Sequence, residues 1–214
     1  MIKHLARCGK NFNHSYMQEF WDQRYDTAEF VYGKHPNAFF REFVDDQQPG
    51  TLLLPAEGEG RNAVYAALKG WDVYAFDFSP KAREKAMELC EEYGVQVDYQ
   101  LSSIEDYTAD RKFDAIALIF LHLPPSTRQM MHRKLIQMIR PGGYFLIEAF
   151  SKKQVHYNTG GPQNIDLLYQ GQDLIDDIGQ LELVHFKEKI RNLDQGYYHH
   201  GKAEVIQLIA RKLN

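Results

Sequence analysis

The chain has 214 residues, of which 44% are hydrophobic and 25% charged, so it can bury a sizeable core and lacks the composition of a disordered protein. Its net charge is −4, and no basic cluster is longer than Lys152-Lys153. This disfavours a nucleic-acid partner, because binding phosphates requires basic side chains. No apolar run is long enough to span a bilayer, and residues 1–13 are too polar for a signal peptide. We therefore expect a cytoplasmic protein without a membrane partner.

Aromatic residues are dense in residues 14–50, where they are mixed with acids and amides. The pattern predicts an amphipathic helix, a loop and a second helix, which end at Pro49-Gly50. We assign residues 1–50 to an N-terminal helical cover and residues 51–214 to the main domain, and we expect the two to form one structural unit.

Strand and helix patterns alternate from Thr51 onward. Helices are predicted near Arg61, between Ser79 and Gly94, and from Pro124, where helix-starting residues precede apolar side chains at helical spacing. Five apolar segments are predicted strands: Thr51–Pro55, Val73–Phe78, Val97–Leu101, Phe113–Phe120 and Tyr144–Phe150. Apolar strands separated by helices predict a parallel, doubly wound α/β sheet.

Two further strand patterns, at residues 181–190 and 203–211, are joined by a loop too short to hold a crossover helix. The two strands must therefore pair antiparallel or run in opposite senses. The expected fold is a mostly parallel, seven-stranded sheet with helices on both faces and a final antiparallel strand. Most nicotinamide-binding domains lack such a reversed strand.

A glycine-containing loop follows the first predicted strand, at the edge where open α/β sheets bind ligands. Gly58 and Gly60 let the backbone approach a ligand, and the helix that opens near Asn62 is expected to point free N–H groups at it. Asp77 ends the second strand, where its carboxylate can accept hydrogen bonds from both hydroxyls of a ribose. The pattern predicts a site for a nucleoside-containing cofactor.

Two glutamates in this loop decide which nucleoside cofactor fits. Glu57 and Glu59 would repel the pyrophosphate of a dinucleotide, at a cost on the order of 1 kcal/mol or more even with strong screening. S-adenosylmethionine (SAM) carries no phosphate and has two cationic groups, so an acidic loop favours SAM over NAD or ATP. The alternative is that both glutamates face solvent and select nothing.

The combination of motifs resembles the class I SAM-dependent methyltransferases, in particular the tellurite-resistance-type branch, which is also similar to thiopurine methyltransferases. The resemblance covers roughly residues 14–212 and rests on the order of Trp21–Tyr25, Tyr32–Asn37, Leu52–Ala63, Gly70–Val73, Asp77–Ser79, Phe120–Pro125, Pro141–Gly143 and Gly160–Pro162. It implies a Rossmann-like class I methyltransferase fold, SAM as cofactor, S-adenosylhomocysteine as product and a small-molecule methyl acceptor.

The resemblance also implies cofactor contacts. Its cofactor-binding residues are Tyr32, Asn37, Glu57, Gly58, Gly60, Asn62, Asp77, Phe78, Ser103, Ile104 and Phe120. Arg24 is expected either to neutralise the SAM carboxylate or to pack on the sheet edge. Two positions depart from the family pattern: Leu54 stands where an acid is common, and Ala56 where a glycine is common. The usual adenine-binding acid is also missing, which leaves Ser103, the Ile104 backbone or Glu105 for that contact.

Candidate residues for the acceptor side follow the later strands. His122 can act as a general base after the fourth strand, or it can cap the loop there. Glu148 near the end of the fifth strand can contact the substrate or form a structural hydrogen bond. Tyr197, Tyr198, His199 and His200 can line the acceptor pocket, unless their loop is a simple polar hairpin.

Methyl transfer from a sulfonium is an in-line displacement, so the protein mainly has to align the reactants and exclude water. A general base is needed only when the acceptor arrives protonated. No HExxH motif or Cys/His cluster is present, so we expect no metal. The sequence thus indicates a SAM-dependent methyltransferase. A SAM-binding module without catalysis and a nicotinamide-dependent oxidoreductase remain as alternatives.

Overall fold

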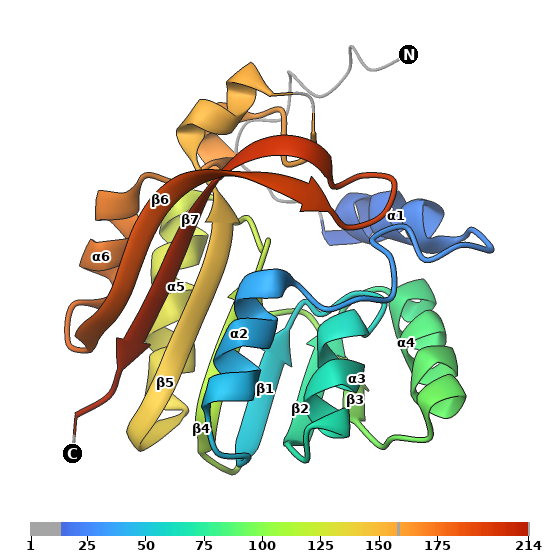
Figure 1. Ribbon diagram of the computed structural model, residues 1–214, viewed down its shortest axis with the longest axis horizontal. Helices are drawn as coiled ribbons and strands as arrows, with labels where there is room; N and C mark the ends of the chain where they lie inside the picture. Colours follow the sequence, from blue (N-terminus) through green and yellow to red (C-terminus); the bar gives the residue numbers. More distant parts are fainter. Residues whose placement is uncertain (1–13, 158, 214) are drawn as a thin grey trace.

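The computed structural model describes residues 14–157 and 159–213. A single sheet of seven strands, in the order β3-β2-β1-β4-β5-β7-β6, forms its centre (Figure 1). The strands are β1 Thr51–Pro55, β2 Asp72–Asp77, β3 Asp98–Leu101, β4 Phe113–Ile119, β5 Ile139–Phe150, β6 Glu182–Asp194 and β7 His200–Arg211. Strands β1 to β5 pair in parallel, as the sequence predicts.

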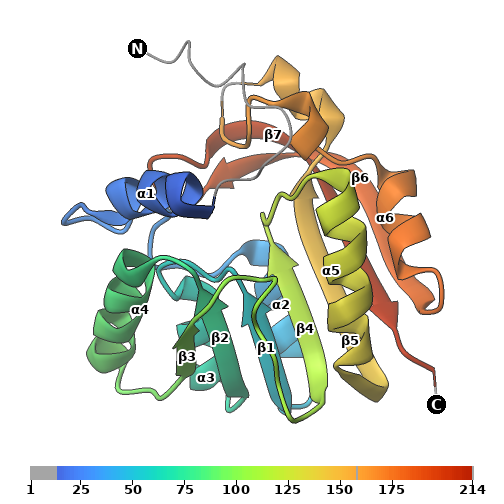
Figure 2. The ribbon, with the colours of Figure 1, turned by 180° about the vertical axis from the view of Figure 1, so that it is seen from behind.

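Helices cover both faces of the sheet, as expected. The helices are α1 His14–Tyr25, α2 Ala38–Asp46, α3 Arg61–Leu68, α4 Pro80–Tyr93, α5 Pro125–Gln137 and α6 Gly171–Ile178, with short 3-10 helices η1 Lys152–His156 and η2 Ile165–Leu167. Helices α2, α3 and α4 pack with Leu52 and Leu54 on one face (Figure 1). Helices α5 and α6 pack with Leu53 on the other (Figure 2). Neighbouring residues of β1 are therefore buried on opposite faces, which explains its unbroken apolar sequence.

The last strand is reversed. Strand β7 is antiparallel to both of its neighbours, β5 and β6. The connection between β6 and β7 spans only residues 195–199, too few for a crossover helix. The sequence prediction of a seven-stranded mixed sheet with a final antiparallel strand is confirmed.

Local sequence signals set the helix ends. The Ser79 side chain accepts a hydrogen bond from the Ala82 amide at 3.1 Å and caps α4, and Gly94 ends that helix in the left-handed conformation. The predicted turn at residues 141–143 lies inside β5, where the register shifts between the pairs Phe113–Ile139 and Ala115–Tyr144. Helix α6 and the two 3-10 helices have no counterpart among the sequence predictions.

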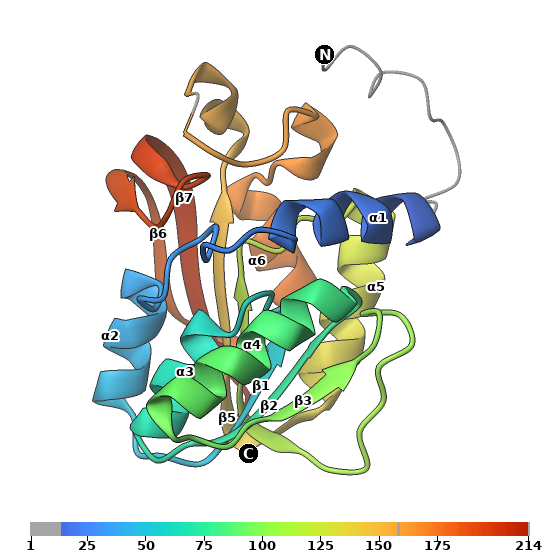
Figure 3. The ribbon, with the colours of Figure 1, turned by 90° about the vertical axis from the view of Figure 1, so that its right-hand side faces the viewer.

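Helix α1 lies across the upper edge of the sheet, above α4 (Figure 3). This edge is formed by the carboxyl ends of the parallel strands, and the β6–β7 hairpin curves toward α1 from the other side (Figure 1). The predicted cover thus has its helices at 14–25 and 38–46, and its residues 1–13 lie outside the described part of the chain. No helix in the described ranges is long and apolar enough to cross a membrane.

The packing of Gly60 yields a stability prediction. A Cβ on Gly60 would lie 2.8 Å from the Ala86 Cβ of α4, and its φ is +86°, whereas Gly94 has φ +64° with open space around it. We expect Gly94→Ala to cost about 1 kcal/mol for the backbone alone. Gly60→Ala adds a steric clash, for a total of about 2–4 kcal/mol.

Urea unfolding of both variants beside the natural protein measures the difference. Equal losses for the two alanine variants would show that α3 and α4 can separate at Gly60 without cost.

Candidate cofactor and acceptor site

Backbone strain marks one place on the carboxyl edge of the sheet. Among the described residues, Ala56 (φ +52°) and Phe120 (φ +55°) are the non-glycine residues with left-handed backbone. They directly follow β1 and β4, the neighbouring strands between which the chain reverses its direction of winding. Ligands of open α/β sheets bind at such a switch point, and strained residues concentrate at functional sites. We therefore take this edge as the candidate site.

The glycine loop after β1 is held rigidly. The Gly58 amide donates to the Asp77 carboxylate at 3.1 Å, and its carbonyl accepts from the Tyr99 hydroxyl at 2.6 Å. A Cβ on Gly58 would lie 2.8 Å from the Tyr25 hydroxyl of α1, so a glycine is required under the cover. A Cβ on Gly60 would project toward Ala86 of α4 and not toward the loop. The lack of a side chain at Gly60 therefore lets α3 and α4 pack closely.

Glu57 turns toward the start of α3. Its carboxylate accepts hydrogen bonds from the backbone amides of Asn62 at 2.8 Å and Ala63 at 2.9 Å, and from the Asn62 side chain at 3.2 Å. The expectation that α3 offers these N–H groups to a ligand is wrong, because Glu57 already occupies them. Burial raises the pKa of Glu57 from 4.5 to about 7, against the opposing effect of these hydrogen bonds.

Asp77 lies at the end of β2, beside the same loop. Its two oxygens accept from the amides of Gly58 and of Ser79, the latter at 2.9 Å. Burial raises its pKa from 3.8 to about 6, although the amides of Ser79, Gly58 and Phe78 oppose the shift. Phe78 itself is half-buried next to it. Each carboxylate oxygen has a second lone pair, so Asp77 can still accept hydrogen bonds from a ligand.

Glu59 fastens the cover to the loop. The Glu59 carboxylate is buried, forms an ion pair with Lys85 at 2.7 Å, and accepts the amides of Val31 at 3.1 Å and Tyr32 at 3.2 Å. The alternative that this glutamate faces solvent is therefore wrong. The charge of Glu59 is matched inside the protein by Lys85.

A buried polar network runs from Asn62 to β5. The Asn62 side chain accepts the Asn37 amide at 2.9 Å, and the Asn37 side chain donates to Glu148. Glu148 is fully buried and also accepts from Arg191 at 2.6 Å and from Gln207 at 2.8 Å. Asn37 additionally caps α2 through the Phe40 amide. The Asn37 and Glu148 side chains thus have partners within the protein, which favours the structural interpretation of Glu148, while the cofactor contact of Asn37 remains a prediction.

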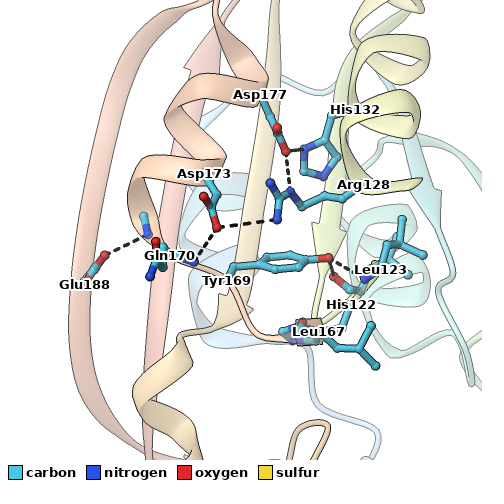
Figure 4. Close-up of polar contacts among 12 residues, drawn as sticks. His122, Leu123, Arg128, His132, Leu167, Tyr169, Gln170, Asp173, Asp177 and Glu188 are labelled. Atoms are coloured by element: carbon cyan, nitrogen blue, oxygen red, sulfur yellow. Dashed lines mark hydrogen bonds and ion pairs between the residues drawn. The ribbon is translucent and has the colours of Figure 1, made fainter. Parts of the chain in front are cut away.

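The loop after β4 is clamped by the connection between β5 and α6 (Figure 4). The Tyr169 hydroxyl donates to the Leu121 carbonyl and accepts the Leu123 amide at 2.7 Å. His122 Nδ1 lies 2.7 Å from the Leu167 carbonyl, and its Nε2 lies 3.2 Å from the Phe150 amide.

Both ring nitrogens of His122 are therefore engaged: Nδ1–H donates and Nε2 accepts. Burial lowers the pKa of His122 to about 4. As placed, this histidine has no lone pair for an acceptor, which favours the capping interpretation over the general base.

Aromatic rings line the site above β4 and β5. The Phe120 ring stacks on Phe150 at a centroid distance of 4.5 Å, and the His199 ring lies 4.6 Å from Tyr32 and 4.7 Å from Phe120. The Arg24 guanidinium donates to the Tyr32 hydroxyl at 3.1 Å. The structure thereby brings together the predicted residues Tyr32 and Phe120.

Two predicted acceptor residues lie outside this cluster. Tyr197 is 85% exposed, and the His200 side chain is 72% exposed and 3.4 Å from Asp194. Tyr197 lies in the turn between β6 and β7, and His200 is the first residue of β7, whereas His199 between turn and strand is buried. Tyr197 and His200 are therefore poor candidates, whereas His199, from the same predicted group, is buried beside the site.

The loop after β3 lies next to the end of β2, since the Ser102 amide donates to the Asp77 carbonyl at 3.0 Å. The Ser103 hydroxyl donates to Asp106 at 2.8 Å and accepts the Asp106 amide, which makes a local turn. Ile104 is buried in the core of the α5 face. Their contact with adenine remains a prediction, in which the backbone of this turn is the available part.

The sequence analysis missed two residues that build the site. Tyr25 and Arg61 lie within the marked motifs, yet no role was expected for them. Arg61 is buried and donates to the Tyr32 carbonyl at 3.0 Å and to Gln195 at 2.9 Å, and so ties the cover to the β6–β7 connection. A charged residue directly after the glycine loop was the available signal. Nothing in the sequence separates His199 from its neighbouring histidine.

Comparisons with known proteins agree with this geometry. The family model described as a methyltransferase domain matches residues 55–143. The ubiquinone biosynthesis O-methyltransferase of Rickettsia conorii is 25% identical over 138 residues, which are 64% of this chain and 48% of the relative. The chain thus spans about half the length of that curated relative.

Solved structures show the same fold. TehB from Haemophilus influenzae has a TM-score of 0.69 at 19% identity, over 91% of this chain and 66% of TehB. Magnesium protoporphyrin IX methyltransferase from Synechocystis, solved with bound SAM, has a TM-score of 0.69 at 15% identity, over 96% of this chain and all of that one. Residues 55–143 therefore match a methyltransferase-domain model, and the described part of the chain has the Rossmann-like fold of these solved structures.

The raised pKa of Glu57 predicts a pH effect on stability. Its pKa is about 7 in the folded protein and near 4.5 when unfolded, so the folded state binds more protons between these values. The free energy of unfolding must then decrease as the pH rises through this window. The decrease is on the order of 3 kcal/mol, since one pKa unit corresponds to about 1.4 kcal/mol.

Glu57→Gln keeps an acceptor for the α3 amides but cannot ionise. Relative to this variant, the natural protein is expected to lose stability as the pH is raised from 4.5 to above 7 in denaturant titrations. A difference that stays constant over that range would contradict the raised pKa.

Proposed function

We propose that the protein transfers a methyl group from SAM to a small-molecule acceptor. The observation that carries this proposal is the position of Glu57. Its carboxylate occupies the amides of Asn62 and Ala63 at the start of α3, where a dinucleotide would place its pyrophosphate. A cofactor without phosphate and with a positive charge suits this loop, and SAM has both properties.

The residues around the loop fit the parts of SAM. Asp77 is the acceptor for the ribose hydroxyls, and Phe78 and the 103–104 backbone border the adenine side. Gly58 presents its backbone beneath the cover. Arg24, with its guanidinium 4.3 Å from the centroid of the Tyr198 ring, is the partner for the cofactor carboxylate. Tyr32 accepts a hydrogen bond from Arg24, and its ring contacts His199, which in turn contacts Phe120.

The protein's contribution to the reaction is alignment and the exclusion of water. SAM supplies an electrophilic methyl group, so the chain needs no nucleophile of its own. Helix α1 and residues 26–37 form a lid in this proposal, since Tyr25 lies on Gly58 and Glu59 holds the amides of Val31 and Tyr32. Breaking and remaking these contacts admits the cofactor and closes the site.

The similar proteins and the aromatic residues of the site both bear on the class of methyl acceptor. Relatives include O-methyltransferases of ubiquinone biosynthesis, which favours a small organic acceptor. The likeness to TehB and the motif pattern support a place near the tellurite-resistance-type branch. The aromatic rings of Tyr32, Phe120 and Phe150 suit an aromatic or soft acceptor.

The rival proposals differ in what the protein binds and does. A nicotinamide-dependent oxidoreductase is favoured only by the strand–glycine–helix–aspartate order. Calorimetric titration with S-adenosylhomocysteine and with NADH separates the two, and we expect binding of S-adenosylhomocysteine alone. Tight NADH binding without S-adenosylhomocysteine binding would overturn the proposal. S-adenosylhomocysteine binding without methyl transfer to any acceptor in a broad screen would favour a non-catalytic module.

Asp77 yields a sharper prediction for cofactor binding. Asp77→Ala is expected to weaken S-adenosylhomocysteine by about 1–3 kcal/mol, because charge-assisted hydrogen bonds to the ribose are lost. Asp72→Ala, at the exposed opposite end of the same strand, is the matched control and should leave the dissociation constant unchanged. Calorimetry measures both. Equal affinity of the natural protein and Asp77→Ala would show that Asp77 does not contact the cofactor.

A further inference from the structure

We propose that His199 binds the methyl acceptor and takes its proton, and that the acceptor is an aromatic molecule with an acidic hydroxyl or thiol group. The proposal rests on the methyltransferase function above and adds to it a residue and a substrate class. The observation behind it is the environment of one atom, the Nδ1 of His199. His199 is 7% exposed, and its Nδ1 is buried without a hydrogen-bond partner among residues 14–157 and 159–213.

A buried nitrogen without a partner is costly, by about 1–3 kcal/mol. Such a group in a candidate site points to a ligand that completes it. The ring belongs to the β6–β7 connection, which the Gln195 amide closes by donating to the His199 carbonyl at 2.8 Å. Arg61 in turn holds Gln195, so His199 is fixed to the first residue of α3, next to the glycine loop.

The aromatic side chains around His199 favour a flat ligand. Its ring contacts Tyr32 from the cover, Phe120 after β4, and Phe150 at the end of β5, the last at a centroid distance of 5.3 Å. A Cβ on Gly160 would lie 2.7 Å from His199 Cδ2, so this glycine lets the chain pass close beside the ring. The edge-to-face contacts with Phe120 and Phe150 and the tilted contact with Tyr32 favour an aromatic acceptor, which enters when the Tyr32 segment lifts.

The charges near His199 favour an acidic group on that acceptor. Burial, and then the positive charges of Arg61 and Arg24, hold the pKa of His199 well below its usual value. The ring is therefore neutral at physiological pH, and a nitrogen lone pair is available. The charge of Arg61, which also acts on His199, favours the negative charge that develops on an oxygen or sulfur as it loses its proton.

The proton and electron balance is simple. A lone pair of the acceptor oxygen or sulfur forms the new bond to the methyl carbon, and the electron pair of the broken carbon–sulfur bond stays on the cofactor sulfur. The acceptor's proton passes to His199 Nδ1, which becomes an imidazolium and later releases the proton to water. The products are the methyl ether or thioether, S-adenosylhomocysteine and one proton.

The test compares phenol with anisole, which has the same ring but no hydroxyl proton. Binding of each to the protein loaded with S-adenosylhomocysteine is measured by calorimetry. We expect the natural protein to bind phenol about tenfold more tightly than anisole, as one hydrogen bond to a buried acceptor allows. His199→Phe, which keeps a ring in the cluster, should bind the two equally, and His199→Asn should regain part of the preference.

His200→Ala is the matched control, because its side chain faces solvent. It should keep the full preference for phenol, and every variant should keep the natural affinity for S-adenosylhomocysteine. With SAM and a series of phenols and thiophenols, His199→Phe should lose about a hundredfold in S-adenosylhomocysteine release, the scale of general-base catalysis. His199→Leu repeats both measurements should His199→Phe fail to fold.

The outcomes separate the two proposals. A natural protein that does not bind S-adenosylhomocysteine overturns the proposed function itself. If it binds S-adenosylhomocysteine but does not distinguish phenol from anisole, or methylates none of the phenols and thiophenols, the role of His199 and the acceptor class are wrong while the cofactor site stands. An undiminished phenol preference in His199→Phe or His199→Leu likewise overturns the role of His199.

Discussion

The carboxylate of Glu57 at the start of α3 is the interaction on which the site depends. It satisfies the amides of Asn62 and Ala63 and lies at the positive end of the helix, where a carboxylate is favourable. The Glu57 carboxylate thus occupies the amides with which the start of such a helix often binds phosphate. We propose that this is how a fold that binds dinucleotides elsewhere accepts a cofactor without phosphate here.

Glu57 also begins a chain of buried hydrogen bonds that crosses the molecule. From Asn62 the chain passes to Asn37 and then to Glu148, whose carboxylate also holds Arg191 of β6 and Gln207 of β7. Removing one member would leave the polar groups bonded directly to it without that partner in the interior, which costs more than the bond itself contributes. The cofactor loop, the cover and the acceptor-side hairpin are therefore positioned relative to one another by polar groups that bond to each other.

The fold was predictable because its signals are local. Unbroken apolar strands, the Ser79 cap and the short connection before β7 each specify their element without reference to the rest of the chain. The polar site was less predictable, because a carboxylate or histidine can face a ligand or the interior with the same sequence around it. Asn37, His122 and Glu148 have their polar groups bound by distant segments, which spacing along the chain does not reveal.

A crystal structure of the complex with S-adenosylhomocysteine tests the central claim most directly. The account predicts ribose hydroxyls within hydrogen-bonding distance of the Asp77 carboxylate, while Glu57 still accepts the amides of Asn62 and Ala63. A ligand bound away from Asp77, or one that displaces Glu57 from the start of α3, would contradict it.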